Sequence, residues 1–115
     1  MDPYEYESGL KEFAAGDSIF RAGDPGETMF VVADGRVEIQ IRGKTVEVVK
    51  KGGIFEEMAL LGSDTRSADA VAATPSRLFP INEALFLRMV KKSPRFSLQV
   101  MQVIADRLRR INELI

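Results

Sequence analysis

The central segment of the chain reads Gly52-Gly53-Ile54-Phe55-Glu56-Glu57-Met58-Ala59-Leu60-Leu61, followed at once by Gly62-Ser63-Asp64-Thr65-Arg66-Ser67-Ala68. The two glycines free the backbone, and the apolar run after them predicts one short helical turn. A loop of turn-forming residues then brings a single arginine, Arg66, to the start of a new strand. The first N–H groups of a helix lack partners within the helix, and an arginine can donate two parallel hydrogen bonds. The segment is therefore suited to a phosphate or a carboxylate, while Glu57 is suited to a sugar hydroxyl.

The composition narrows the classes of function. A chain of 115 residues fits one domain, residues 1–115, and 45% apolar with 29% charged residues is ordinary for a folded globular protein. Cysteine and histidine are both absent, which removes thiolate metal sites, cysteine nucleophiles and the commonest general base. We therefore expect a binding module and no enzyme, metal or cofactor. A metal enzyme on a cupin-type barrel is set aside because it needs clustered histidines.

Charge and hydropathy give expectations about partners and location. No apolar run approaches the roughly 20 residues of a membrane helix, and the first residues are acidic and aromatic, so we expect a cytoplasmic protein without membrane contact. A net charge of −1 offers no general attraction to nucleic acid. Within these residues no helix-turn-helix follows the last helix, so we expect no nucleic-acid binding by this chain, an expectation that a longer chain would lift.

Short antiparallel strands are predicted for the first half. Glycine and aspartate turns separate apolar runs at 10–13, 18–20, 29–32, 37–41 and 45–49. Further strands are predicted at 68–72 and 77–81. Polar residues alternate with the branched side chains of Val37, Ile39 and Ile41, which predicts that these three face the core.

Helical periodicity begins after Asn82, which can cap a helix that ends before Pro94 and has one apolar face, made by Leu85, Phe86, Met89 and Val90. A second helix follows, with a broad apolar stripe (Leu98, Met101, Val103, Ile104, Leu108 and Ile111) and solvated arginines at 107, 109 and 110. The apolar end at Leu114 and Ile115 predicts a homodimer through this helix. Together the elements predict an α+β fold, an antiparallel β-roll of the double-stranded jelly-roll type with a short internal helix and two C-terminal helices.

A glycine framework runs through the first half: Phe13-Ala14-Ala15-Gly16-Asp17-Ser18-Ile19-Phe20, then Gly23-Asp24-Pro25-Gly26-Glu27, then Met29-Phe30-Val31-Val32 before Gly35. With the central segment, this framework resembles the cyclic nucleotide-binding domain family, the ligand-sensing module of catabolite activator proteins, protein kinase A regulatory subunits and nucleotide-gated channels. The resemblance covers nearly the whole chain. It implies a β-roll with Gly16, Gly23 and Gly35 in tight turns of positive φ, and a non-catalytic sensor of cAMP or cGMP, with cAMP the simplest choice.

The central segment is similar to the phosphate-binding cassette of that family. The resemblance implies that Glu57 holds the ribose 2′-hydroxyl, that Arg66 pairs with the cyclic phosphate, and that Ser67 assists through its hydroxyl or N–H. It places Ala59 where the short helix begins to cover the phosphate, and relatives use an apolar side chain near Met58 against the purine. The plainer alternatives are a surface arginine paired with an aspartate at 64 or 69, a first-turn carboxylate that favours the helix dipole, and core packing for Met58, Leu60 and Leu61.

Two residues depart from the cassette: Glu56 replaces the family's glycine, and Thr65 replaces a common proline. An inward Glu56 carboxylate about 5 Å from a phosphate would oppose binding by roughly 3 kcal/mol at an effective dielectric near 20. Arg66 would contribute roughly 1.5 to 3 kcal/mol in favour. An inward Glu56 could also pair with Arg66 as an internal substitute for phosphate, whereas an outward one would leave the site free.

The leading interpretation is a ligand-sensing module that binds a 3′,5′-cyclic nucleotide and signals through its C-terminal helix, which the resemblance places on a hinge near residues 93–94. The alternative is a domain that keeps the fold, has lost nucleotide binding because of Glu56, and acts as an interaction or dimerisation module.

Overall fold

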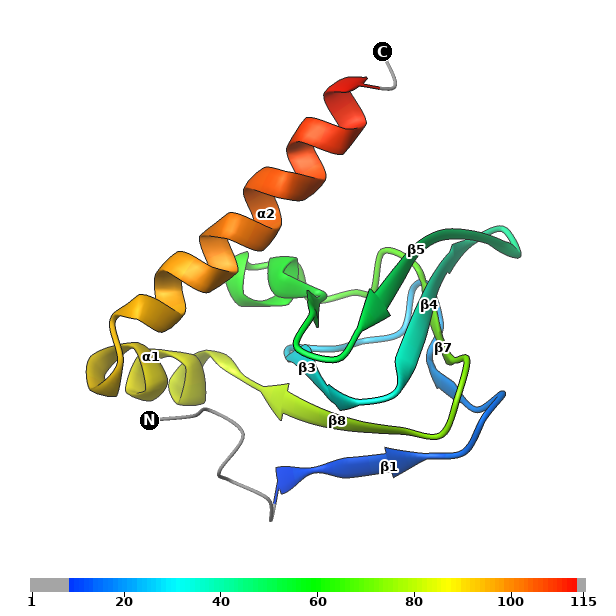
Figure 1. The fold of residues 1–115 in the computed structure, drawn as a ribbon, viewed down its shortest axis with the longest axis horizontal. Coiled ribbons are helices and arrows are strands. Elements are labelled where there is room, and N and C mark those ends of the chain that lie inside the picture. The colour runs from blue at the N-terminus through cyan, green and yellow to red at the C-terminus, as the bar shows by residue number, and fades with distance from the viewer. Residues whose placement is uncertain (1–8, 114–115) are drawn as a thin grey trace.

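Two four-stranded antiparallel sheets form the β-roll (Figure 1). The computed structural model describes residues 9–113. One sheet has the order β1 (Lys11–Phe13), β8 (Ser76–Ile81), β3 (Met29–Asp34) and β6 (Ile54–Phe55). The other has the order β2 (Ser18–Phe20), β7 (Asp69–Ala72), β4 (Arg36–Ile41) and β5 (Lys44–Lys50). The short 3-10 helix η3 (Glu57–Leu61) and two C-terminal helices complete the fold, and the predicted fold class is confirmed.

Strand β3 is buried on both faces because its alternate side chains enter two different cores. Phe30 and Val32 lie between the two sheets, with Phe20, Val37, Ile39, Val49, Phe55 and Leu78. Met29 and Val31 belong to a second core under the helices, with Ile54, Phe79, Ile81, Met89, Phe96 and Val100. The helices are thus attached to the outer face of one sheet by burial of apolar surface.

The strand predictions hold with two corrections. Val37 and Ile39 are buried, but Ile41 is 48% exposed, since it ends β4 next to the turn at Arg42 and Gly43. The placement of Ile41 in the core was wrong. Strand β6 was missed, because two residues are too few to show an alternating pattern.

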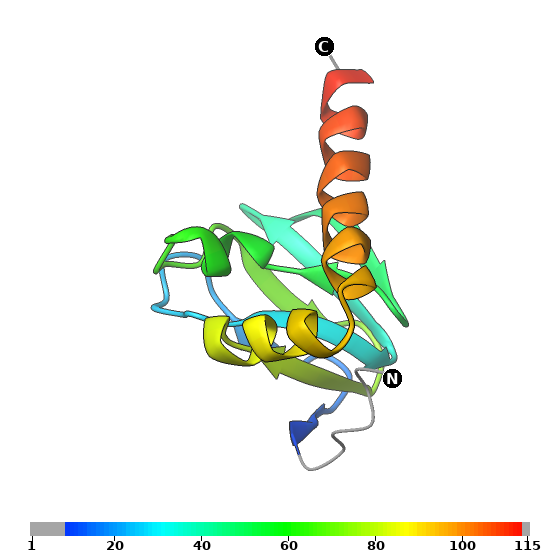
Figure 2. The same ribbon diagram turned by 90° about the vertical axis from the view of Figure 1, so that its left-hand side faces the viewer.

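Helix α1 (Glu83–Lys92) begins as predicted, with the Asn82 side chain accepting a hydrogen bond from the N–H of Leu85 at 2.8 Å. Helix α2 (Arg95–Glu113) buries Phe96 and Val100. Figures 1 and 2 show that its C-terminal turns extend beyond the sheets. No helix within residues 9–113 is long and apolar enough to cross a membrane.

Burial of the predicted α2 stripe is only partial. Val103 and Ile104 pack against the second core, while four large apolar residues of the helix are exposed: Leu98, Met101, Leu108 and Ile111. The predicted apolar end at Leu114 and Ile115 lies outside the described residues.

Gly16, Gly23 and Gly35 have φ values of 88°, 87° and 92°, which confirms the predicted turns. Gly35 also lacks space for a side chain, because a Cβ there would lie 2.3 Å from the Ser76 hydroxyl and 2.5 Å from the Pro75 carbonyl oxygen. Gly43 has a φ of 79° and no atom within 4 Å of its Cβ position. Substitutions at the two glycines therefore distinguish the cost of the left-handed backbone from the cost of a steric clash.

We expect Gly35→Ala to lower the free energy of unfolding by about 2 to 4 kcal/mol, because it combines the left-handed backbone with a clash against β8. Gly43→Ala, the matched control, should cost about 1 kcal/mol from the backbone alone. Urea denaturation of both variants measures the difference, and equal losses would contradict the steric argument.

Candidate functional site

The backbone of Arg66 is held by the loop that follows β2. Its N–H donates to the Asp24 carbonyl at 2.8 Å, and its own carbonyl accepts from the Gly23 N–H at 2.8 Å. The Gly26 N–H donates to the Asp64 carbonyl oxygen at 2.9 Å. These bonds fix the loop at residues 23–26 beside the loop at residues 64–66. They direct the Arg66 side chain between the two loops and the roll.

The Arg66 guanidinium is buried at the end of the inter-sheet core. Nη1 donates to the Thr28 carbonyl at 2.6 Å and Nη2 to the Thr28 hydroxyl at 3.0 Å. Its Cζ atom lies 4.5 Å from the ring centroid of Phe20 and 5.3 Å from that of Phe30, within the range of cation–π attraction. A Cβ at Gly26 would lie 2.2 Å from Nε, so only glycine leaves room for this side chain.

One hydrogen-bonding group of Arg66 stays unused. Its Nε is buried and has no hydrogen-bond partner among the residues that the structure describes. A buried N–H without an acceptor costs free energy, because the group has lost its water. The guanidinium is therefore positioned by the fold but incompletely satisfied by it.

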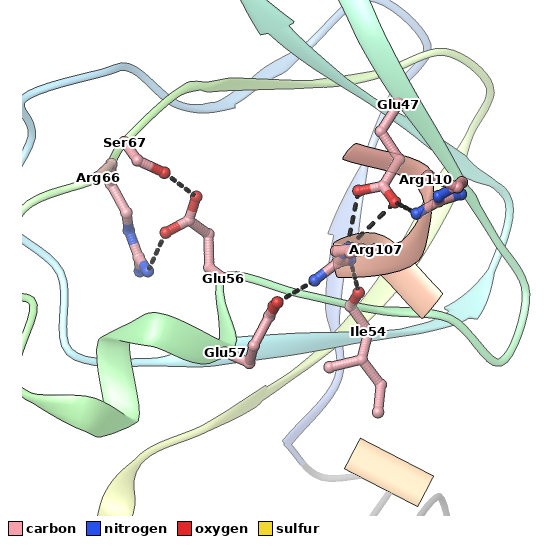
Figure 3. A network of polar contacts seen from close by, with 8 residues as sticks. All are labelled: Glu47, Ile54, Glu56, Glu57, Arg66, Ser67, Arg107 and Arg110. Atoms are coloured by element: carbon pink, nitrogen blue, oxygen red, sulfur yellow. Dashed lines mark hydrogen bonds and ion pairs between the residues drawn. The ribbon is translucent and has the colours of Figure 1, made fainter. Parts of the chain in front are cut away.

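Glu56 points inward, toward Arg66 (Figure 3). Its carboxylate lies 4.0 Å from Arg66 Nη1, and the exposed fractions of the two side chains are 8% and 6%. The Ser67 hydroxyl donates to the other carboxylate oxygen at 3.3 Å. Glu56 has a φ of 59°, the left-handed conformation that glycine adopts readily and glutamate adopts at a cost. The inward alternative for Glu56 is thus the one observed, and Arg66 pairs neither with Asp64 nor with Asp69.

This pair is held together weakly. Burial raises the pKa of Glu56, and the positive charge of Arg66 and the Ser67 hydroxyl oppose that shift only in part. Burial likewise lowers the pKa of Arg66, against the opposing charges of Glu56 and Asp24. Both shifts favour the neutral forms. The loss of hydration therefore exceeds what each group regains from the other, which is the expected balance for a buried pair at the limit of ion-pair distance.

Glu57 points the other way, toward helix α2 (Figure 3). Its carboxylate accepts a hydrogen bond from Arg107 Nη1, and Nη2 of the same guanidinium donates to the Ile54 carbonyl. Arg107 Nε donates to both carboxylate oxygens of Glu47 at 3.1 Å, and Arg110 also donates to Glu47. Two carboxylates and two guanidinium groups join the short helix, β5 and α2.

The prediction of a solvated Arg107 was wrong. Burial opposes its charge, but the hydrogen bonds and charges of Glu57 and Glu47 outweigh burial and raise its pKa. Sequence reasoning missed Glu47 altogether. Glu47 lies between Val46 and Val48, as a solvated residue of an alternating strand would. The sequence therefore held no signal that Glu47 has a partner on α2.

An apolar groove of about 800 Å³ lies between β5 and α2, floored by Ile41, Val46 and Val48 and walled by Arg107, Arg110 and Ile111. All three floor residues are exposed. Arg107, which lines the groove, also donates a hydrogen bond to Glu57, the carboxylate that the family resemblance assigns to ribose.

The structure brings together three of the six predicted site residues: Glu56, Arg66 and Ser67. Glu57 is the next residue but contacts α2. Met58 is 54% exposed, and Leu61 is also exposed, so the core role expected for these two was wrong. Ala59 lines a separate hollow of about 400 Å³ next to the start of α1. The ligand-binding roles of all six stay predictions.

The fold is thus an antiparallel roll with a buried arginine at one end of the core between the sheets and with α2 held against it through Arg107. The sequence model of the cyclic nucleotide-binding domain matches residues 10–93, and the chain belongs to this family. The family's module is a regulatory binding domain and is not itself catalytic.

Individual relatives agree with this assignment. The cyclic AMP receptor protein of Thermus thermophilus is 30% identical over 102 residues, covering 84% of this chain and 47% of the relative. A cAMP-dependent protein kinase regulatory subunit of Debaryomyces hansenii is 38% identical over 66 residues, covering 57% of this chain and 15% of the relative. The solved catabolite activator protein of Thermus thermophilus superposes with a TM-score of 0.77 at 27% identity, covering 97% of this chain and 57% of that one. The chain thus spans at most about half the length of these curated relatives.

We expect Arg107→Gln to loosen the C-terminal half of α2, because it leaves Glu57 and Glu47 without their shared cation. A loss of about 1 to 3 kcal/mol of local stability corresponds to roughly tenfold to hundredfold faster amide exchange there. Hydrogen exchange measured by mass spectrometry compares this variant with Arg109→Gln, whose guanidinium pairs with Asp106 of the same helix at 3.3 Å. Equal protection of α2 in the two variants would contradict a role for Arg107 in holding α2 against the roll.

Proposed function

We propose that the chain is a regulatory module that binds a 3′,5′-cyclic nucleotide, with cAMP favoured over cGMP, and signals through helix α2. The observation that carries this proposal is Arg66, a buried guanidinium held by Thr28 and two phenyl rings, with one N–H unsatisfied among the described residues. A fold bears the cost of such a group more readily when a ligand anion completes it. The names of the relatives, a cyclic AMP receptor protein and a cAMP-dependent kinase subunit, support cAMP.

The signal would pass through Glu57. In the proposed complex the ribose 2′-hydroxyl approaches the carboxylate that Arg107 now occupies. A hydroxyl and a guanidinium compete for the same oxygens, so ligand binding changes the free energy that holds α2 against the roll. The groove between β5 and α2 would receive the base, since its apolar floor suits a purine face. The predicted cytoplasmic location stays a prediction.

We expect calorimetry to detect cAMP binding, with cGMP weaker. Arg66→Lys should weaken cAMP binding at least about tenfold, because an ammonium group offers neither two parallel hydrogen bonds nor a planar surface for the phenyl rings. Arg21→Lys, at an exposed position outside the site, serves as the control and should bind like the parent. Absence of both heat and thermal shift at about 1 mM of either nucleotide would defeat the proposal.

The second candidate is an interaction module that has lost nucleotide binding. Two observations favour it: the Glu56 carboxylate lies 4.0 Å from Arg66 Nη1, and α2 exposes apolar side chains. The exposed residues Leu98, Met101, Leu108 and Ile111 are separated by three, seven and three residues. Spacings of three and seven residues occur in the heptad pattern of paired helices, so the partner that fits is α2 of a second copy.

Light scattering across a concentration series should therefore show a dimer. Leu108→Glu should shift the equilibrium toward monomer by at least about tenfold, because it places a charge in the apolar seam. Gln99→Glu adds the same charge at another exposed position of the helix and should leave the dimer intact. A parent that stays monomeric at high concentration would exclude this partner.

A further inference from the structure

Adjacent residues supply two carboxylates to two different arginines. Glu57 pairs with Arg107 on α2, whereas Glu56 turns back to Arg66 and Ser67 (Figure 3). In that position Glu56 has a left-handed backbone, φ 59°, which glutamate adopts less readily than glycine. The Glu56 carboxylate could extend into water, but it lies instead beside the buried guanidinium of the proposed phosphate site.

We infer that Glu56 is an internal competitor for the phosphate, and that a cyclic nucleotide displaces it from Arg66 with uptake of one proton by the Glu56 carboxylate. The inference rests on the proposed function and deepens it. It makes the sensor respond to nucleotide and acidity together, with the ionised carboxylate closing the site and the protonated carboxylic acid opening it.

Charge balance in the buried site carries the argument. Ionised Glu56 and Arg66 cancel, with side chains that are 8% and 6% exposed. A cyclic phosphodiester brings a further negative charge and has no proton to lose near neutral pH. Two anions on one guanidinium would leave a net charge of −1 with little hydration, which a low-dielectric site strongly disfavours. Addition of a proton to Glu56 restores neutrality and turns one carboxylate oxygen into a donor.

The surroundings of Glu56 favour protonation of its carboxylate. Burial already raises the pKa of Glu56 in the ligand-free domain, with Glu57 raising it further and Arg66, the Ser67 hydroxyl and Arg107 opposing. Asp24 acts on Arg66 from the facing loop. A phosphate in contact with Arg66 offsets the charge that most favours the ionised carboxylate. The nucleotide complex therefore holds the proton more tightly than the free domain does, and by linkage affinity rises as pH falls.

The test is calorimetric titration with cAMP of the parent, Glu56→Gln, Glu56→Gly and the control Glu12→Gln, an exposed glutamate of β1. We expect Glu56→Gln to bind about tenfold to hundredfold more tightly than the parent near neutral pH. Parent affinity should rise as pH is lowered from about 8 to about 5, by up to roughly tenfold per pH unit, while the affinity of Glu56→Gln stays flat. Glu12→Gln should behave like the parent.

Repeating the titrations in buffers of different ionisation enthalpy counts protons directly. The parent should take up as much as one proton per cAMP bound, and Glu56→Gln none. Glutamine keeps the strained left-handed backbone and removes only the charge, whereas glycine relieves the strain and removes the whole side chain. A gain shared by the two variants therefore identifies the carboxylate as the cause.

The outcomes distinguish this inference from the proposed function. Equal affinities of parent and Glu56→Gln, or binding by the parent without proton uptake, overturn the inference and leave the proposed function standing. Parent binding confined to acidic pH, with Glu56→Gln binding at neutral pH, supports it. If neither the parent nor Glu56→Gln binds cAMP at any pH, the proposed function fails and the inference fails with it.

Discussion

The burial of one positive charge constrains this domain more than any other single feature. A guanidinium can leave water only where the protein supplies acceptors and polarisable surface in its place. For Arg66 these are the carbonyl and hydroxyl of Thr28 and the faces of Phe20 and Phe30. Both phenyl rings also belong to the core between the sheets. The packing that stabilises the roll therefore also positions Arg66, the residue proposed to bind the phosphate.

A second consequence concerns the two loops that approach Arg66. They are joined by backbone hydrogen bonds between residues 23–26 and 64–66, and a β-carbon at Gly26 would collide with the guanidinium. The protein therefore fixes the rotamer of Arg66 in the absence of ligand. Such preorganisation reduces the entropy lost on binding, because no long side chain remains to be ordered.

Sequence patterns predicted those parts of the structure that depend on local chemistry. Alternation predicted β4, and a capping asparagine with a later proline predicted α1. The family resemblance predicted the left-handed backbone at Gly35. Contacts across many residues were missed. Arg107 reads as one of several arginines on a polar helix face, and its burial depends on Glu47, 60 residues earlier. Exposure of Ile41 depends on its place at the strand end, which alternation cannot show.

For the site, sequence reasoning could name Glu56 as a departure from a glycine but could not give its direction. That direction follows from the competition between a strained backbone and an attraction to Arg66, two terms of similar size and opposite sign. The structure shows the inward direction, while burial still raises the pKa of Glu56 and lowers the pKa of Arg66 against their mutual attraction.

A small margin is what a sensor requires. A ligand can shift an equilibrium only by the difference between its affinities for the two states. If the internal pair were strong, a phosphate could not displace it at any accessible concentration. At 4.0 Å, with one oxygen held only by the Ser67 hydroxyl, Glu56 shields the guanidinium without securing it. The neighbouring Glu57 accepts a direct hydrogen bond from Arg107, and the pKa of Arg107 is raised in spite of its burial. In the proposed mechanism the phosphate replaces the Glu56 carboxylate at Arg66, whereas the contact between Glu57 and Arg107, which holds α2, is the one whose release would report binding.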